Sequence, residues 1–326
     1  MKFYYIMNFN LIFTSMIWAL SSTSWFSLWL LMEINSLMFF PLMTIKMNQK
    51  SSEAVFKFFL VQSFSSLLII FSISFNYFQL MLFSSINIYT MILMLSLLMK
   101  LGFFPFILWY INILSEVSYT IIFFILTLQK IIPLYFISLI LDKNNLFYFS
   151  FFVTMNCLIT VLMVFSQTKI KKIIIFSSSI QMSWLMLSMI FNISFFFIFF
   201  LFYTTLMYSI IKFLDFYNLN YLNQVYAVKN IYFNFTLMIL AGFPPFSGFI
   251  LKWMTLFYLT SYHYWFLSFV LLVSSIANLL FYSRLMFSSI FYSAPINKWA
   301  KNLLYPYNSL FIINFLMPIF LSMFIS

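Results

Sequence analysis

The sequence predicts an all-α polytopic membrane protein with about eleven transmembrane helices, and three observations support this fold class. Only 6% of the 326 residues are charged, whereas soluble domains have about 25%. Hydrophobic residues make up 65% of the chain, and the mean hydropathy is +1.06. Such a chain cannot cover a soluble surface with polar groups, and it is too apolar to be disordered. At about 20 apolar residues per span, its length allows roughly ten to twelve transmembrane helices.

The apolar runs give these helices in order. They fall at about 4–22, 25–45, 54–74, 86–110, 117–141, 146–166, 172–190, 192–213, 231–260, 264–285 and 307–325. Each run is long enough to cross a bilayer as a helix. The longest polar stretches, about 213–230 and 286–306, are too short to form a soluble core. We therefore expect one transmembrane domain over residues 1–326.

Basic residues test this helix count, because successive loops lie on alternate sides of the membrane. The N-terminal side collects twelve of the sixteen Lys and Arg residues, the opposite side has one, and three lie inside apolar runs. The positive-inside rule then places the N-terminus in the compartment where the chain is made and the C-terminus across the membrane. Adding or removing one helix midway would destroy this asymmetry, which also disfavours a seven-helix receptor. The rule explains the net charge of +11 without nucleic acid as a partner. Lys169, Lys171 and Lys172 fit contact with an anionic phospholipid such as cardiolipin.

Cysteine and histidine are nearly absent. Cys157 stands alone in an apolar run, which excludes a disulfide framework and a thiolate metal site and predicts a small buried hydrophobe. His263, the single histidine, lies at a predicted helix end, where an interface contact is expected. The chain also lacks GxGxxG and a histidine pair for haem. We expect no metal and no cofactor bound by this chain.

Four ionisable residues lie deep inside predicted transmembrane helices, where a charge is costly: Glu33, Lys100, Lys130 and Lys252. Each costs about 2.5–3.5 kcal/mol or more at bilayer depth and is by default a functional candidate. A buried lysine suits proton transfer, because desolvation disfavours its charged form while a nearby carboxylate favours it. Since Glu33 is the one deep carboxylate, Lys100 is its expected partner. The alternative is that these long side chains extend along their helices, so that the charged groups reach the membrane–water interface.

That alternative suits Lys57 and Lys212, which lie near the ends of their runs. Lys57 also stands four residues after Glu53, a spacing that predicts an ion pair on a helix surface.

The glycines indicate two broken helices. All three occur in two short segments, KLGFFPF and AGFPPFSGF. Proline interrupts a helix, and in lipid a break survives only where protein or water satisfies the freed backbone groups. Lys100 precedes the first break and Lys252 follows the second, in helices that run in opposite directions. This order predicts inverted repeats, the first at about 4–141 and the second at about 146–285, followed by a C-terminal helix at about 307–325; coincidental kinking is the alternative. The break residues are Gly102, Pro105, Gly242, Pro244, Pro245 and Gly248.

A further polar group enters the membrane on the helix that follows Lys172. It comprises Ser177, Ser178, Ser179 and Gln181. These side chains could order water in a proton path or bond a neighbouring helix, and the sequence leaves both alternatives open.

These motifs together resemble the antiporter-like membrane subunits of respiratory complex I, specifically the chain 2 family of mitochondrial NADH–ubiquinone oxidoreductase. The resemblance covers about residues 30–255 and rests on Glu33 and on EAVFKFF at 53–59, KLGFFPFILW at 100–109, LQKIIPL at 128–134, SQTKIKKIIIFSSSI at 166–180 and GFPPFSGFILKW at 242–253. Two departures stand out. Leu128 replaces a usual tryptophan, and Gln181 replaces a usual histidine and cannot titrate.

The resemblance implies a proton-translocating subunit in which Glu33, Lys100, Lys130 and Lys252 form the proton path. It implies the mitochondrial inner membrane, with the N-terminus in the matrix and the C-terminus in the intermembrane space. Codon-linked enrichment in Phe, Ile, Met, Tyr, Asn and Lys fits an AT-rich organellar genome. The implied partners are NADH dehydrogenase subunits 4 and 4L and the lateral helix of subunit 5, with FMN, iron–sulfur clusters and ubiquinone elsewhere in the complex. An independent cation/proton antiporter and a non-conducting scaffold subunit are the alternatives.

Overall fold

A computed structural model of the chain describes residues 2–44, 48–82, 88–141, 146–225 and 231–291. The helix predicted at about 307–325, with Lys298 and Lys301 before it, lies outside the described residues. The chain forms two compact units, Met1–Asn156 and Cys157–Ser326, and each is described by itself.

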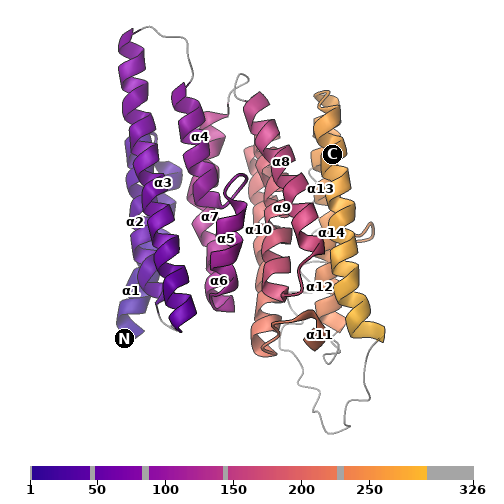
Figure 1. Cartoon of the computed structure of the whole chain (residues 1–326). Helices are drawn as coiled ribbons and strands as arrows, with labels where there is room; N and C mark the ends of the chain where they lie inside the picture. Colours follow the sequence, from indigo (N-terminus) through magenta and orange to yellow (C-terminus); the bar gives the residue numbers. More distant parts are fainter. Residues whose placement is uncertain (1, 45–47, 83–87, 142–145, 226–230, 292–326) are drawn as a thin grey trace. The chain divides into compact units, whose positions relative to one another are not determined.

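The described residues of unit 1 form seven helices and the start of an eighth (Figure 1). They are α1 (Lys2–Ser21), α2 (Trp25–Met43), α3 (Gln49–Leu82), α4 (Ile88–Leu101), α5 (Ile107–Ser115), α6 (Tyr119–Leu126), α7 (Leu128–Ile140) and α8 (Leu146–Phe165), which continues into unit 2. The Ser24 hydroxyl caps α2 by accepting a hydrogen bond from the Ser27 amide at 3.3 Å. Within this unit α7 packs against α1, α2, α4 and α6. It therefore lies at the centre of the unit.

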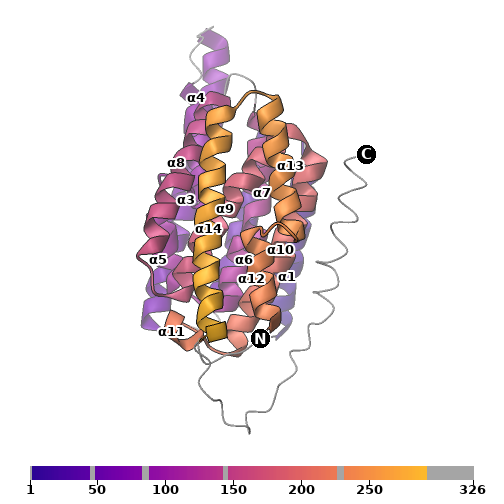
Figure 2. The same cartoon turned by 90° about the vertical axis from the view of Figure 1, so that its right-hand side faces the viewer.

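Unit 2 contains the remaining described helices, and α9 is its centre. They are α9 (Ile170–Phe191), α10 (Ile193–Phe216), α11 (Leu222–Val225), α12 (Ile231–Ala241), α13 (Ser247–Ser261) and α14 (Trp265–Phe291). In α9, 94% of the 18-residue apolar stretch that could span the membrane is buried, and the helix packs against α10, α13 and α14. Figure 2 shows α13 and α14 side by side, joined by a short turn. Since lipid is as apolar as the helices, such packing depends on close contact and polar bonds between helices.

The described helices confirm the predicted all-α polytopic membrane fold. Seven helical segments are long and apolar enough to cross a membrane, counted over the described residues alone. The other predicted spans in this part of the chain correspond to α1 and to the two pairs α4/α5 and α12/α13, whose halves are individually short.

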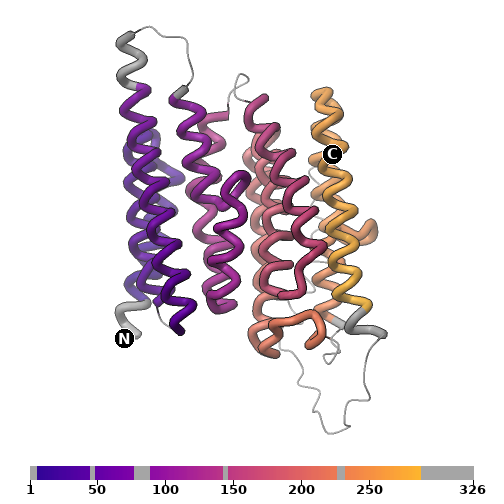
Figure 3. Tube along the Cα trace, viewed as in Figure 1, coloured from indigo at the N-terminus to yellow at the C-terminus, as the bar shows by residue number. Residues whose placement is uncertain are grey.

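The first predicted break separates α4 from α5, and the tube in Figure 3 leaves its helical path there. Gly102 has φ +67°, the left-handed conformation that glycine adopts at a helix C-terminus. The Phe103 amide bonds the Leu98 carbonyl at 2.9 Å, as in a Schellman motif. The Phe106 amide then bonds the Phe103 carbonyl at 2.7 Å, closing a turn that contains Pro105.

The second predicted break, between α12 and α13, repeats this backbone design. Gly242 has φ +85°, and the Phe243 amide bonds the Met238 carbonyl at 3.2 Å. The Phe246 amide bonds the Phe243 carbonyl at 3.0 Å and closes a turn that contains Pro245. Both breaks are therefore confirmed, and glycine and proline occupy corresponding positions in each.

The span predicted at about 117–141 is confirmed as Tyr119–Ile140, and it contains a third interruption that was not predicted. The α6 helix ends at Leu126 and α7 begins at Leu128. At the junction the Thr127 hydroxyl bonds the Phe123 carbonyl at 2.7 Å, competing with the backbone for that acceptor. Pro133 within α7 also lacks an amide hydrogen for the carbonyl four residues earlier.

The two connections that follow α8 and α10 lie together. The Ile170 amide bonds the Asn220 carbonyl at 3.0 Å, and the Leu222 amide bonds the Thr168 carbonyl at 3.2 Å. The alternation of spans predicts these two connections on the same side of the membrane, and this contact agrees with it.

Candidate functional site

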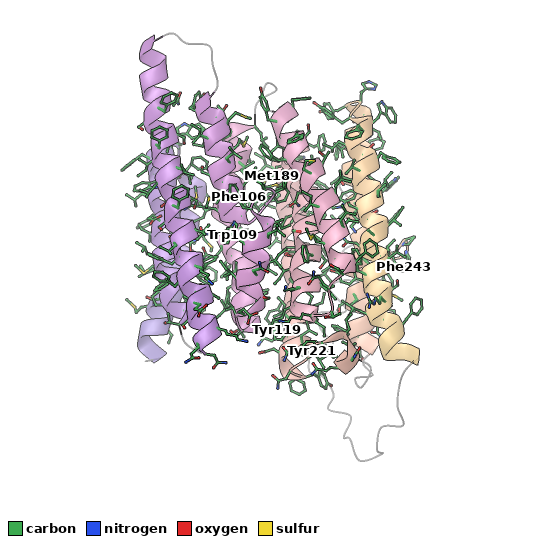
Figure 4. The ribbon with its side chains drawn as sticks, in the orientation of Figure 1. Phe106, Trp109, Tyr119, Met189, Tyr221 and Phe243 are labelled. Carbon is green, nitrogen blue, oxygen red and sulfur yellow. The ribbon has the colours of Figure 1, made fainter. Side chains whose placement is uncertain are left out.

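Polar side chains from α3 and α8 satisfy backbone groups that the first break frees. The Lys100 carbonyl, near the end of α4, accepts a hydrogen bond from Gln62 Nε2 of α3 at 3.3 Å. The Phe104 amide donates to Asn156 Oδ1 of α8 at 3.2 Å. A helix break inside a membrane needs such partners, because lipid offers none. Figure 4 labels Phe106 and Trp109, which lie about midway along the helices of this unit, whereas Tyr119 lies near one end.

Lys100 and Glu33 interact electrostatically, as the sequence predicts, but no direct ion pair joins them in the described structure. Lys100 is buried, while Glu33 of α2 is half-buried. The Glu33 Oε2 atom is enclosed and has no hydrogen-bond partner among the described residues. The carboxylate is thus placed to act on the ammonium without being fixed to it.

Lys130 contacts an aromatic ring next to the first break. Its Nζ lies 5.5 Å from the centroid of the Tyr110 ring of α5, within the range of a cation–π interaction. A Cβ atom at Gly102 would overlap this ring. The break glycine, Tyr110 and Lys130 are therefore packed in succession, and Lys130 is buried three residues after the α6/α7 junction.

At the second break, side chains bond the last two carbonyls of α12. Lys252 Nζ donates to the Ala241 carbonyl at 2.7 Å, and Gln181 Nε2 donates to the Leu240 carbonyl at 2.8 Å. The negative end of a helix favours a cation at this point. Lys252 is 5% exposed and its Nζ lies 5.9 Å from the centroid of the Trp184 ring. In Figure 4 Phe243, in this break, lies at a height between Met189 and Tyr221 of the same unit.

The glycines of the second break make room for these contacts. A Cβ atom at Gly242 would lie 2.9 Å from Lys252 Nζ, and one at Gly248 would overlap the Ile239 carbonyl oxygen. The α13 helix can therefore approach the end of α12 only because residue 248 has no side chain.

The polar residues on α9 differ in their hydrogen-bond acceptors. Gln181 bonds a neighbouring helix, since its acceptor is on α12. Each of the three serines donates to the carbonyl three residues earlier in α9, at 2.9 Å from Ser177, 2.7 Å from Ser178 and 2.6 Å from Ser179. All four residues are buried.

The remaining predicted residues lie outside this site. Glu53 and Lys57 form the predicted exposed ion pair at 3.6 Å, and Cys157 is buried as expected. Lys212 is exposed, in keeping with a place near the end of its run. His263 is exposed at the end of α13. Among the residues that the structure describes, no three His, Cys, Asp or Glu side chains gather as metal ligands.

Sequence reasoning missed the amides that support the first break. Gln62 and Asn156 lie 38 and 52 residues from their backbone partners. The available signal was a lone amide within an apolar run, because such a group needs a partner in lipid.

Broken helices in both repeats of a chain are a feature of transporter folds. The chain belongs to the NADH:quinone oxidoreductase/Mrp antiporter membrane family, whose pattern matches residues 22–277. Over 301 residues it is 33% identical to NADH-ubiquinone oxidoreductase chain 2 of Anopheles gambiae, covering 89% of this chain and 86% of that protein.

Two solved structures share the fold. A chain of respiratory complex I from Thermus thermophilus matches with a TM-score of 0.78 and 16% identity, over 88% of this chain and 70% of that one. A chain of the Mrp complex from Dietzia matches with a TM-score of 0.75 and 18% identity, over 87% and 60% respectively.

Proposed function

We propose that this chain is a proton-translocating membrane-arm subunit of NADH:ubiquinone oxidoreductase in the mitochondrial inner membrane. The observation that carries the proposal is the pairing of each helix break with buried lysine: Lys100 and Lys130 near Gly102, and Lys252 against Gly242. Family membership and the name of the 33% identical relative support the same conclusion.

Glu33, Lys100, Lys130 and Lys252 are the residues to which we assign proton transfer. A buried lysine holds a proton only while a negative group stabilises its ammonium. At Lys100 that group is Glu33, and at Lys252 it is the carbonyl end of α12. A movement that weakens either interaction would release the proton, and a movement that restores it would favour uptake.

The redox chemistry belongs to other subunits in this proposal. FMN, iron–sulfur clusters and ubiquinone are cofactors and substrate of the whole complex, and this chain binds none of them. Its partners would be other membrane subunits, with subunits 4 and 4L and the lateral helix of subunit 5 as specific candidates. Cardiolipin would contact the basic face around Lys171, with the N-terminus in the matrix and the C-terminus in the intermembrane space.

Lys100→Met tests the assignment in the assembled complex. Methionine keeps the apolar length of lysine but cannot carry a proton, so we expect NADH-driven proton translocation to fall by about tenfold or more, since a positioned proton-transfer group contributes roughly 10²–10⁴-fold. The measurement is dye-reported acidification of membrane vesicles alongside NADH oxidation. Lys212→Met on the exposed face of α10 is the matched control. Normal assembly with unchanged translocation would refute the role of Lys100.

The first alternative that the sequence leaves open is an independent cation/proton antiporter. An independent antiporter would exchange cations for protons when reconstituted alone, whereas a complex I subunit would be active only with its partners. A scaffold subunit, the third candidate, would tolerate Lys100→Met and Lys252→Met without loss of translocation.

A further inference from the structure

The outward face of the second break is exposed, although the break lies far from both ends of its span. α12 contributes eleven residues to this span and α13 contributes fifteen, and the break is the turn between them. Figure 4 labels Phe243, which is in this turn. The exposed side continues along α13 through aromatic residues spaced four apart, which lie on one side of a helix. We call this surface the break face, and its residues are Phe243, Pro244, Pro245, Phe249, Trp253 and Phe257.

The turn of the break face offers hydrogen-bond acceptors and no free backbone donor. Proline has no amide hydrogen, so Pro244 and Pro245 can only accept. The Phe243 amide is already bonded to the Met238 carbonyl. Among the described residues, no group donates to the Pro244 or the Pro245 carbonyl. Lipid tails supply no donor, and non-helical backbone at membrane depth is tolerated only where it is buried in protein or lines a water-filled cavity.

Trp253 adds one donor to the break face, at a depth that lipid does not explain. It is 52% exposed, lies about two turns from either end of α13, and its indole N–H has no hydrogen-bond partner among the described residues. The other exposed tryptophans of the described chain are Trp18, near the end of α1, and Trp265, at the start of α14. Helix ends are where the membrane–water interface favours tryptophan. Away from that interface, an exposed tryptophan is typical of a surface where two proteins meet.

These polar groups determine the chemistry of a complementary partner. It must donate to a proline carbonyl at the break and accept from the Trp253 indole on α13. Hydroxyl and carboxamide side chains, those of Ser, Thr, Asn and Gln, both donate and accept. Such side chains also hydrogen-bond between helices within membranes. A lipid tail does neither, so the break face fits a polar-faced protein helix better than it fits lipid.

We propose that the break face binds a transmembrane helix of another membrane subunit, and that this helix carries a hydroxyl or carboxamide side chain opposite the break. This side chain donates to the carbonyl of Pro244 or Pro245, and a second polar group of the same helix accepts from Trp253 Nε1. Phe249 and Phe257 provide apolar contact on either side of Trp253. The inference rests on the proposed function for the existence of partner subunits, and it does not depend on proton transfer by this chain.

A high-resolution map of the assembled wild-type complex identifies the occupant. We expect a side-chain nitrogen or oxygen of another subunit about 2.7–3.2 Å from the carbonyl oxygen of Pro244 or Pro245. Lipid acyl chains, a second copy of this chain, or residues 292–326 of this chain on the break face would overturn the inference while leaving the proposed function intact. If the chain purifies without other subunits, the proposed function fails and the inference fails with it.

Trp253→Phe tests the contact energetically, because it removes the indole N–H and keeps an aromatic ring. We expect the amount of the contacting subunit that co-purifies with this chain during a detergent titration to fall by about twofold to tenfold, the effect of one net hydrogen bond. Trp265→Phe is the matched control, because Trp265 is exposed at the start of α14 and does not belong to the break face. Equal retention in the two variants would contradict the contact. If Trp253→Phe does not assemble, the wild-type map decides the question.

Discussion

At the scale of single residues, Gln181 illustrates how one side chain can hold a position without titrating. Its amide donates to the Leu240 carbonyl at 2.8 Å and is 4% exposed. A histidine, which the family resemblance leads one to expect here, could also have carried a proton. Gln181 supplies the structural part of such a role, since the Leu240 carbonyl would otherwise be free at a helix end inside the membrane.

Gln181→Leu should therefore destabilise the second break. Leucine leaves the Leu240 carbonyl unbonded, which costs about 1–3 kcal/mol. The measurement is the temperature at which the subunit dissociates from the purified complex, and we expect a lower temperature for the variant. Gln167→Leu is the matched control, because Gln167 lies two residues after the end of α8 and bonds the Met163 carbonyl of that helix near its exposed end. Equal dissociation temperatures for the two variants would contradict the capping role.

At the scale of helices, the breaks determine where the buried charges can lie. Both breaks use a glycine with positive φ followed by a proline-containing turn, and both bring the backbone close to a functional candidate or its aromatic neighbour. At the second break the closest approach is between α13 and the end of α12, where Gly248 faces the Ile239 carbonyl.

Gly248→Ala should push these two segments apart. The added methyl group would overlap the backbone oxygen of Ile239, which cannot rotate away as a side chain could. Overpacking of this kind costs about 1–3 kcal/mol or more. We expect less assembled complex on native gels and an impaired Lys252–Ala241 contact, measured as reduced proton translocation per complex. Ser261→Ala, at the exposed end of the same helix, should assemble normally; equal assembly of both variants would count against the close approach.

The sequence predicts the helices and the two glycine breaks well, because both signals are local. Apolar runs separated by basic loops locate the spans, and glycine is so scarce that Gly102 and Gly242 mark special backbone. The α6/α7 junction escapes prediction because Thr127 is compatible with a helix and its effect arises from one side-chain bond. The aromatic neighbours of the buried lysines could not be predicted from the sequence either, for a different reason. Tyr110 and Trp184 look like two more aromatics in a chain that is 24% aromatic, and only tertiary packing brings them to Lys130 and Lys252.

At the scale of the whole molecule, the few basic residues predict a membrane topology that can be tested. Twelve of the sixteen basic residues fall on one predicted side, and this asymmetry predicts that the loop after α8 lies in the matrix and the turn after α13 in the intermembrane space. Three spans, α9, α10 and the α12/α13 pair, separate these two connections. An odd number of crossings requires that they lie on opposite sides.

Single-cysteine labelling measures this orientation directly, because Cys157 is 0% exposed and should not react with a membrane-impermeant maleimide. Ser166→Cys, at the exposed end of α8, should be labelled in inside-out inner-membrane vesicles and protected in mitoplasts. Ser261→Cys, at the exposed end of α13, should show the reverse pattern. The parent chain without either substitution is the control. Labelling of both positions from the same face would contradict the odd number of crossings between them. If Ser166→Cys were labelled only in mitoplasts and Ser261→Cys only in inside-out vesicles, the fold would stand. The membrane orientation that the positive charges predict would then be reversed.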